Sequence, residues 1–107
     1  MGSYKGENQM IKSYLNQTVS YKSRTGKDEY NQATFATAVD IPAKYEYSRK
    51  EVLNREGERV ISESVCFTTV EVKAGDIITF DGIDWPVIVA TPERGLGGEV
   101  DHYECRL

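Results

Sequence analysis

Apolar and polar residues alternate most regularly between Val39 and Tyr47. The odd-numbered positions of this segment are apolar or aromatic, and the even-numbered positions are mostly polar or charged. A period of two is typical of a β-strand with one buried face. Pro42 falls on the polar face and has no amide hydrogen, so we expect this strand to lie at a sheet edge or to contain a bulge there.

A second long strand is expected from Val60 to Val72, a segment rich in Val, Ile, Thr and Phe. Its alternation slips between Ile61 and Val65, which predicts a β-bulge. The highly charged segment from Arg49 to Arg59 separates the two strands and contains an Asn-Arg-Glu-Gly turn. We therefore predict a long hairpin with a charged tip that projects from the body. A helix over Arg49–Glu56 is the alternative.

The C-terminal third has the pattern of a β-meander. Ile77–Phe80 is a short apolar run. Asp81-Gly82 follows it, and this pair favours a two-residue hairpin because a type I′ turn needs positive φ at both central positions. Trp85–Ala90 is the expected partner strand. A glycine-punctuated loop over Thr91–Gly98 and a closing strand over Val100–Leu107 complete the chain.

The N-terminal part carries weaker patterns. Residues 1–9 are polar and include two glycines, so we expect a flexible arm there. Ile11, Tyr14 and Leu15 have the spacing of one helical turn, which is stable only when it docks on a core. Thr18–Ser23 alternates as a short strand.

A polar loop over Arg24–Gln32 follows that strand. The complete pattern predicts a mainly β fold, a small antiparallel barrel or sandwich of five to six strands in one domain over residues 10–107. The predicted core consists of Val19, Tyr21, Val39, Ile41, Tyr45, Phe67, Trp85, Val87, Val89, Tyr103 and Leu107.

Length and charge narrow the possible functions. A chain of 107 residues suits one domain with one modest core. Its net charge of −4 disfavours general binding to nucleic-acid backbone or to anionic membranes, although a local basic patch is still compatible with it. No apolar run approaches the roughly 20 residues of a membrane-spanning helix, and the polar N-terminus does not resemble a secretory signal.

The residues that could support catalysis are few. Cys66 and Cys105 fall inside predicted strands and are expected to be buried, reduced thiols, which indicates a cytosolic setting. The single histidine, His102, lies near Asp101, and such a set could activate a thiolate. Strand alternation, however, places His102 opposite Cys105 and puts Asp101 on the Cys105 side. We therefore predict a surface histidine and no enzymatic activity.

Neither a metal nor a cofactor is predicted. Two cysteines and one histidine are one ligand short of a zinc site, and the carboxylates do not have the spacing of a calcium loop. The segment Arg94-Gly95-Leu96-Gly97-Gly98 superficially resembles a phosphate-binding loop. Such loops lead into a helix, whereas a strand follows here. The glycines are expected to supply positive φ in a wide hairpin connection.

Two charged segments are candidate contact surfaces, with two solvated loops as the alternative. Alternating charges on a projecting arm could complement the next copy in a ring, which needs only one arm and one receiving edge. The candidate interface residues are Arg49, Lys50, Glu51, Arg55, Glu56 and Arg59 in the arm, and Lys27, Asp28 and Glu29 in the polar loop.

The order of several short motifs resembles a known family. These motifs are Tyr14-Leu15-Asn16-Gln17-Thr18-Val19, the hairpin with its Asn-Arg-Glu-Gly turn, Val72-Lys73-Ala74-Gly75-Asp76-Ile77-Ile78-Thr79-Phe80-Asp81-Gly82, Trp85-Pro86-Val87, and a glycine-rich loop before His102-Tyr103-Glu104. Together, over roughly Met10 to Leu107, they are similar to the head–tail joining proteins of tailed bacteriophages, also called head-closure, stopper or neck proteins. The motifs are structural turns and carry no catalytic signature.

The resemblance implies a virion protein that assembles in the bacterial cytoplasm. Such a protein forms a homo-oligomeric ring below the portal and its adaptor, contacts tail proteins, and lets packaged DNA pass without sequence-specific binding. In some members a loop closes the channel, and the Arg49–Arg59 arm is the best candidate for that loop or for a contact with a neighbour. Mild acidity suits a DNA conduit, because a wall that attracts phosphates would hinder passage. A tail-terminator ring protein is a related alternative.

Two further alternatives come from other classes. An oligonucleotide-binding barrel would place aromatic platforms and basic residues on an exposed sheet face. The alternation of Tyr21, Tyr45 and Tyr47 with Lys22, Lys44 and Arg49 fits that pattern weakly and fits core and rim positions better. A small hydrolase would have to use one of the two cysteines as its nucleophile.

Overall fold

The computed structural model describes residues 15–107, and within that part the regular structure is entirely β. The predicted flexible arm over residues 1–9 lies outside the described residues. So does the predicted helical turn, apart from Leu15, which is buried and not helical. The strands are β1 (Gln17–Lys22), β2 (Arg24–Lys27), β3 (Ala33–Phe35), β4 (Val39–Leu53), β5 (Arg59–Thr68), β6 (Ile77–Phe80), β7 (Ile83–Pro86), β8 (Val89–Arg94) and β9 (Val100–Arg106).

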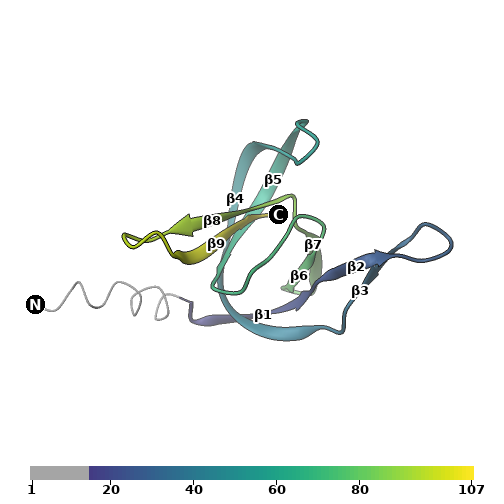
Figure 1. Cartoon of the computed structure of the whole chain (residues 1–107), viewed down its shortest axis with the longest axis horizontal. Coiled ribbons are helices and arrows are strands. Elements are labelled where there is room, and N and C mark those ends of the chain that lie inside the picture. The colour runs from purple at the N-terminus through teal and green to yellow at the C-terminus, as the bar shows by residue number, and fades with distance from the viewer. Residues whose placement is uncertain (1–14) are drawn as a thin grey trace, which may run out of the picture.

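Seven of these strands form one antiparallel sheet in the order β7-β6-β1-β4-β5-β9-β8, and β2 pairs with β3 in a separate ribbon. β4 joins the two halves of the large sheet (Figure 1). Its first part pairs with β1 up to Ala43, and the remainder pairs with β5 from Lys44 onward. The edge strands β7 and β8 do not pair with each other, so the sheet does not close into a barrel. Of the two predicted architectures, a closed barrel is therefore wrong. The prediction of five to six strands was too low.

The core lies between the two halves of the sheet. It consists of Val19, Ile41, Ala43, Cys66, Val72, Ile78, Phe80, Val87, Cys105 and Leu107. Four of the predicted core residues are among these, and Tyr21, Tyr45, Trp85 and Tyr103 pack against them. Phe67 and Val89 are only half-buried. Val39 is 52% exposed, so its assignment to the core was wrong. Val39 is the first residue of β4 and lies two residues before buried Ile41, outside the core.

β5 buries two serines, although a larger apolar residue next to them is exposed. Ser62 and Ser64 are fully buried, whereas Ile61 is 45% exposed. Part of the cost of burying these hydroxyls is offset by hydrogen bonds, since the Ser62 hydroxyl lies within 3.1 Å of the Leu107 carbonyl and also accepts from the Arg106 guanidinium. This inversion explains the slip in alternation that predicted a bulge in β5.

The extra residue of the bulge lies in the partner strand. Tyr47 pairs with Ser64 and Lys50 with Ser62, so β4 advances by three residues while β5 advances by two. Buried Arg106 donates a hydrogen bond to the carbonyl of Ser48 at this bulge. The base of the β4–β5 hairpin is therefore tied to the C-terminal strand.

Three hairpin loops share one backbone geometry: Asp28–Gln32, Asn54–Glu58 and Gly95–Glu99. In each, the first N–H bonds to the carbonyl of the fifth residue, and the fourth N–H bonds to the carbonyl of the first. The fourth residue has positive φ in every case, with values of 64° at Asn31, 83° at Gly57 and 82° at Gly98. This is the arrangement expected of a three-residue loop that ends in a left-handed residue.

The shorter Asp81-Gly82 turn was predicted correctly. Its φ values are 53° and 72°, and Phe80 pairs with Ile83 on either side. The predicted strand over Trp85–Ala90 was wrong in its continuity. Val87 exchanges hydrogen bonds with the Gly75–Asp76 turn, and the Ile88 N–H bonds to the Arg106 carbonyl. The chain therefore changes its hydrogen-bonding partner between Val87 and Ile88, from the Gly75–Asp76 turn that precedes β6 to strand β9.

Other boundaries also differ from prediction, since the first part of the predicted Thr91–Gly98 loop belongs to β8, which continues to Arg94. Arg24–Gln32 is not simply a polar loop, because it contains β2 and the turn of the β2–β3 hairpin. The strand predicted over Val60–Val72 ends at Thr68, whose hydroxyl donates to the Pro42 carbonyl at 2.9 Å and accepts from the Val70 N–H. The edge strand or bulge predicted at Pro42 was wrong, because β4 is the central strand of the sheet and its bulge lies farther on; Pro42 is tolerated because it pairs with β1 only, where β4 has not yet met β5.

Candidate functional site

The most prominent surface feature is an arm formed by the ends of β4 and β5 (Figure 1). The predicted long hairpin is confirmed, and the alternative helix over Arg49–Glu56 is wrong because β4 continues to Leu53. Asn54 shapes the tip, since its side-chain oxygen accepts hydrogen bonds from the N–H groups of Glu56 at 3.0 Å and Glu58 at 2.9 Å. The arm is thus a strand-built projection with an ordered turn.

Most predicted interface residues of the arm form ion pairs within it. Arg49 lies 3.8 Å from Glu63, and Arg59 lies 3.9 Å from Glu51. Arg55 lies 3.6 Å from its neighbour Glu56. All of these side chains are more than half exposed, so each pair adds at most about 1 kcal/mol to stability. The pairs do neutralise much of the charge that the sequence offered to a neighbouring copy.

The two faces of the arm differ in character. On the outer face, exposed Leu53 (58%) and Ile61 (45%) lie beside the Glu51–Arg59 ion pair. On the inner face, Val52 and Val60 pair directly and are half-buried. The outer face therefore combines apolar surface with neutralised charge, a composition that suits contact with another protein.

The β2–β3 hairpin carries the remaining predicted interface residues. Asp28 is occupied with its own turn, because its carboxylate accepts from the N–H groups of Tyr30 and Gln32. Glu29 is exposed at the tip. Lys27 instead lines a groove between β2 and the tip of the arm, and Arg55 in that tip also lines it. The structure thus brings together two predicted residues, one from each charged segment.

A bulge in β2 determines which side chains face this groove. Arg24 pairs with Phe35 and Lys27 with Ala33, so β2 uses one more residue than β3 over this stretch. Without the bulge, alternation would put Arg24 and Lys27 on opposite faces. With it, both lie on one face and both line the groove. Sequence periodicity alone could not show this.

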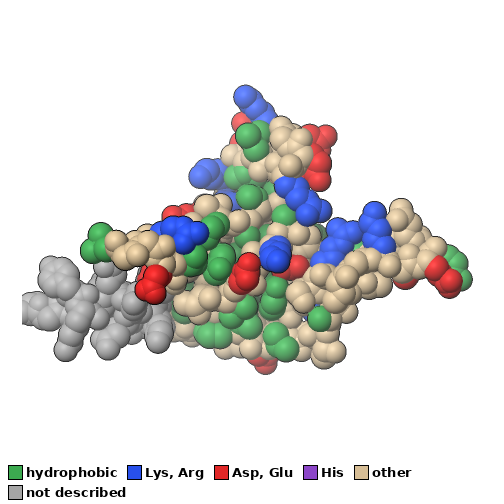
Figure 2. All heavy atoms as spheres, in the orientation of Figure 1, with side chains coloured by type: hydrophobic (Ala, Val, Ile, Leu, Met, Phe, Trp, Pro, Cys, Tyr) green, Lys and Arg blue, Asp and Glu red, His purple; other side chains and the backbone are tan. Residues whose placement is uncertain are grey.

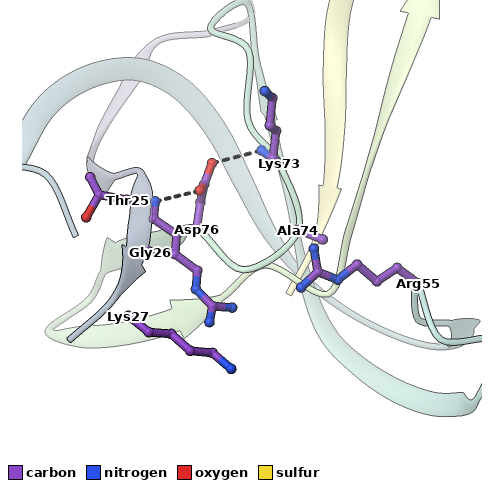
Figure 3. A pocket seen from close by; sticks show the side chains of 8 residues that line it. Thr25, Gly26, Lys27, Arg55, Lys73, Ala74 and Asp76 are labelled. Atoms are coloured by element: carbon purple, nitrogen blue, oxygen red, sulfur yellow. Dashed lines mark hydrogen bonds between the residues drawn. The ribbon is translucent and has the colours of Figure 1, made fainter. Parts of the chain in front are cut away.

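Buried Asp76 anchors the floor of the groove (Figure 3). Its carboxylate accepts hydrogen bonds from the N–H groups of Arg24 and Lys73, both at 2.8 Å, and from the Tyr21 hydroxyl at 2.7 Å. Burial and this carboxylate raise the pKa of Tyr21 well above its usual value. Asp76 thus joins β1, the start of β2 and the 73–76 turn.

The groove has a volume of about 570 Å³ and is lined by four cationic side chains, those of Arg24, Lys27, Arg55 and Lys73. In Figure 3, Lys27 and Arg55 reach toward the groove from different elements. Figure 2 shows Lys and Arg side chains gathered in the angle between the arm and the β2–β3 hairpin. The amino-acid sequence does not reveal this site, because Arg24 and Lys73 are far apart in the chain and follow no motif.

The predicted Cys, His and Asp residues do not form a catalytic set. β9 bulges at Asp101, since Glu93 pairs with His102 and Arg94 with Val100. The bulge brings the Asp101 carboxylate to 3.0 Å from His102 Nδ1, so its assignment to the Cys105 face was wrong. His102 is half-buried rather than on the surface, and its ring packs edge-on against Phe67, on the face opposite Cys105.

The two thiols are neighbours in the core. Cys66 pairs with Cys105 across β5 and β9, and both are fully buried and free, as predicted. Burial raises the pKa of Cys66 to about 12 and also raises the pKa of Cys105. Such thiols remain protonated near neutral pH and are poor nucleophiles. Across residues 15–107, no cluster of three or more His, Cys, Asp or Glu side chains is placed to bind a metal.

The tyrosines proposed as a base-stacking platform are engaged within the protein. Tyr45 stacks on Phe80 with ring centroids 3.9 Å apart, and Phe80 stacks on Trp85 at 5.3 Å. Tyr47 packs edge-on against both of these partners. The hydroxyls of Tyr45 and Tyr47 both donate to Asp81. The cluster therefore supports the packing of β4 on the β6–β7 hairpin.

None of the described residues belongs to a helix long and apolar enough to cross a lipid bilayer. Comparison of the amino-acid sequence with protein-family models and with curated proteins finds no match.

Proposed function

We propose that this chain is a structural subunit of the head–tail interface of a tailed bacteriophage. In this role it joins a ring of identical copies between the portal–adaptor complex and the tail. The order of turn motifs in the sequence suggests the family. The observation that carries the proposal is the arm, a strand-built projection whose outer face presents Leu53 and Ile61 beside paired charges.

The energetics of that face favour a protein partner. Burying the exposed parts of Leu53 and Ile61 stabilises a contact by about 1.5–3 kcal/mol. The flanking Glu51–Arg59 pair is already neutralised, so its burial costs less than burial of an isolated charge. A head-to-tail ring repeats this contact at every subunit, and a modest local gain thereby becomes a stable assembly.

The test compares two surfaces of equal exposure. Ile61 on the arm is 45% exposed and Ile83, at the far edge of the sheet, is 46% exposed. We expect the double variant Leu53→Asp/Ile61→Asp to fold normally yet fail to join rings. The control, Ile83→Asp, should assemble like the wild type. Both variants alter exposed positions, so thermal unfolding should show little change in stability.

Assembly is measured by mixing the protein with the portal and adaptor proteins encoded in the same genome. Analytical ultracentrifugation reports incorporation, and negative-stain microscopy shows whether a ring is added. A wild-type protein that never joins the portal–adaptor complex would contradict the proposed function. A double arm variant that assembles as well as the control would show that the arm is not the contact.

A further inference from the structure

We propose that the groove between the tip of the arm and β2 binds the phosphate backbone of nucleic acid and makes no contact that distinguishes bases. The site is formed by β2, the 73–76 turn and the tip of the arm. This inference goes beyond the ring-subunit role and does not require it, because binding by the isolated chain is measured directly.

The cations of the groove are available for an external anion. Within residues 15–107, the side chains of Arg24, Lys27 and Lys73 form no ion pair. Arg55 has only a long, exposed contact with Glu56. The carboxylate of Asp76 is buried beneath the groove and is occupied by three hydrogen bonds. The groove therefore carries a net positive charge, with four cationic side chains against the one buried carboxylate.

The backbone holds part of this charge in place before any ligand binds. Asp76 fixes the main chain of Arg24 and of Lys73 through their N–H groups. Gly75 has a φ of +95°, and a Cβ built there would lie 3.4 Å from Cδ of Arg24. The Arg24 side chain therefore lies against a glycine that leaves it room. A site whose cations are positioned in advance loses less entropy when it binds.

The lining favours phosphate over other ligands. Arginine, lysine and threonine are the side chains that most often contact phosphate oxygens, and Thr25 completes that set here. Among residues 15–107, no aromatic side chain lines the groove, so these residues offer no platform on which a base could stack. Its other lining residues are Gly26, Ala74 and Asp76, which offer no deep apolar pocket for the side chains of an acidic peptide.

The net charge of −4 sets the expected strength of binding. Long-range repulsion between the acidic chain and nucleic acid is screened beyond about 10 Å in 0.1 M salt, whereas contacts inside the groove act at short range. Binding is therefore expected to be weak and steeply dependent on salt. If the four cations each neutralise one phosphate, the logarithm of the affinity should fall with the logarithm of salt concentration with a slope of about −3.6.

The experiment measures fluorescence anisotropy of a labelled DNA duplex at several salt concentrations. The groove variant is Lys27→Gln/Arg55→Gln, and the control variant is Lys50→Gln/Arg59→Gln. Both remove one exposed lysine and one arginine that has an exposed ion pair, so the net charge changes equally. We expect the groove variant to lose at least tenfold in affinity and to reduce the salt slope by about 2. The control should lose less than threefold.

Three results of the binding measurements would overturn the proposal. The first is no binding of duplex DNA at low salt. The second is equal weakening by both variants, which would indicate diffuse attraction. The third is poly-glutamate binding as tightly as DNA with the same dependence on the groove variant, which would assign the groove to an acidic protein segment. Amide chemical shifts of the wild-type protein, followed as the duplex is added, should change at residues 24–27, 55 and 73–76. Changes confined to other residues would also refute the site.

Discussion

Removing the carboxylate of Asp76 should be among the most damaging single changes to this fold. Asp76 is 4% exposed and accepts hydrogen bonds from two main-chain N–H groups and from the Tyr21 hydroxyl. Each hydrogen bond to a charged group is worth about 1.5–3 kcal/mol, and a buried donor left without a partner costs about 1–3 kcal/mol. Because the adjacent groove admits water, we expect Asp76→Ala to lower the free energy of unfolding by about 3–5 kcal/mol.

The Tyr21 contact can be separated from the rest of the network. Tyr21→Phe removes one of the three hydrogen bonds, so its expected cost is about 1–2 kcal/mol. In the double variant Tyr21→Phe/Asp76→Ala, that bond is already absent. The double variant should therefore lose less stability than the two single variants lose in total, and the difference, the coupling energy, should be about 1 kcal/mol or more.

Urea unfolding followed by the fluorescence of Trp85 provides the assay, because this residue is the single tryptophan and it packs against Phe80. Asp84→Ala is the matched control. Asp84 is exposed and accepts one hydrogen bond, from the Thr79 hydroxyl, so its loss should cost less than about 1 kcal/mol. The reasoning is refuted if Asp76→Ala costs no more than Asp84→Ala, or if the two changes in the double variant are fully additive.

Two further predictions concern the core. Phe80 is buried and stacks on both Tyr45 and Trp85, so Phe80→Ala should lower the free energy of unfolding by about 3–5 kcal/mol; urea unfolding followed by circular dichroism measures this, and a loss below about 1.5 kcal/mol would contradict the packing. Burial raises the pKa of the Cys66 thiol from 9.0 to about 12. Below pH 9 this thiol is protonated in both the folded and the unfolded chain, so its full contribution to stability is present. Between pH 9 and 12 it ionises only in the unfolded chain, so that contribution is lost as the pH rises. Stability should fall by about 1.4 kcal/mol per pH unit for this thiol, and Cys66→Ala, compared in reducing buffer at pH 8 to 10.5, should fall less steeply; equal slopes would show that the thiol is accessible in the folded protein.

Strand-forming segments with strong local patterns were recognisable in the sequence. Alternation around Ile41 and Ala43 indicated the inward face of β4, and both residues are buried. Asp81-Gly82 indicated its turn because few residues other than Gly, Asn and Asp adopt positive φ readily. The arm was predictable because its two strands flank a charged turn. These features depend on the preferences of residues that are close together in the chain.

Other strands were hidden because their local patterns are ambiguous. The β2–β3 hairpin has an asparagine, Asn31, at the left-handed position that glycine occupies in the arm tip and in the β8–β9 loop. The segment over Arg24–Gln32 therefore resembled an unstructured polar loop. β5 buries Ser62 because Arg106 and the Leu107 carbonyl supply partners from distant parts of the chain, whereas the buried hydroxyl of Ser64 has no hydrogen-bond partner among residues 15–107. Hydrophobicity alone favoured burial of Ile61, which is exposed.

The groove is the feature that was least predictable from the sequence. Lys27 and Arg55 were recognised as charged surface residues, but their convergence depends on the bulge in β2 and on the position of the arm above the 73–76 turn. The sequence by itself determined the β class, the arm and the tight turns, because period and turn preference are properties of neighbouring residues. Only the tertiary structure decided strand register, the bulges and the collection of cations, because these depend on which distant strands pair and on which buried polar groups find partners.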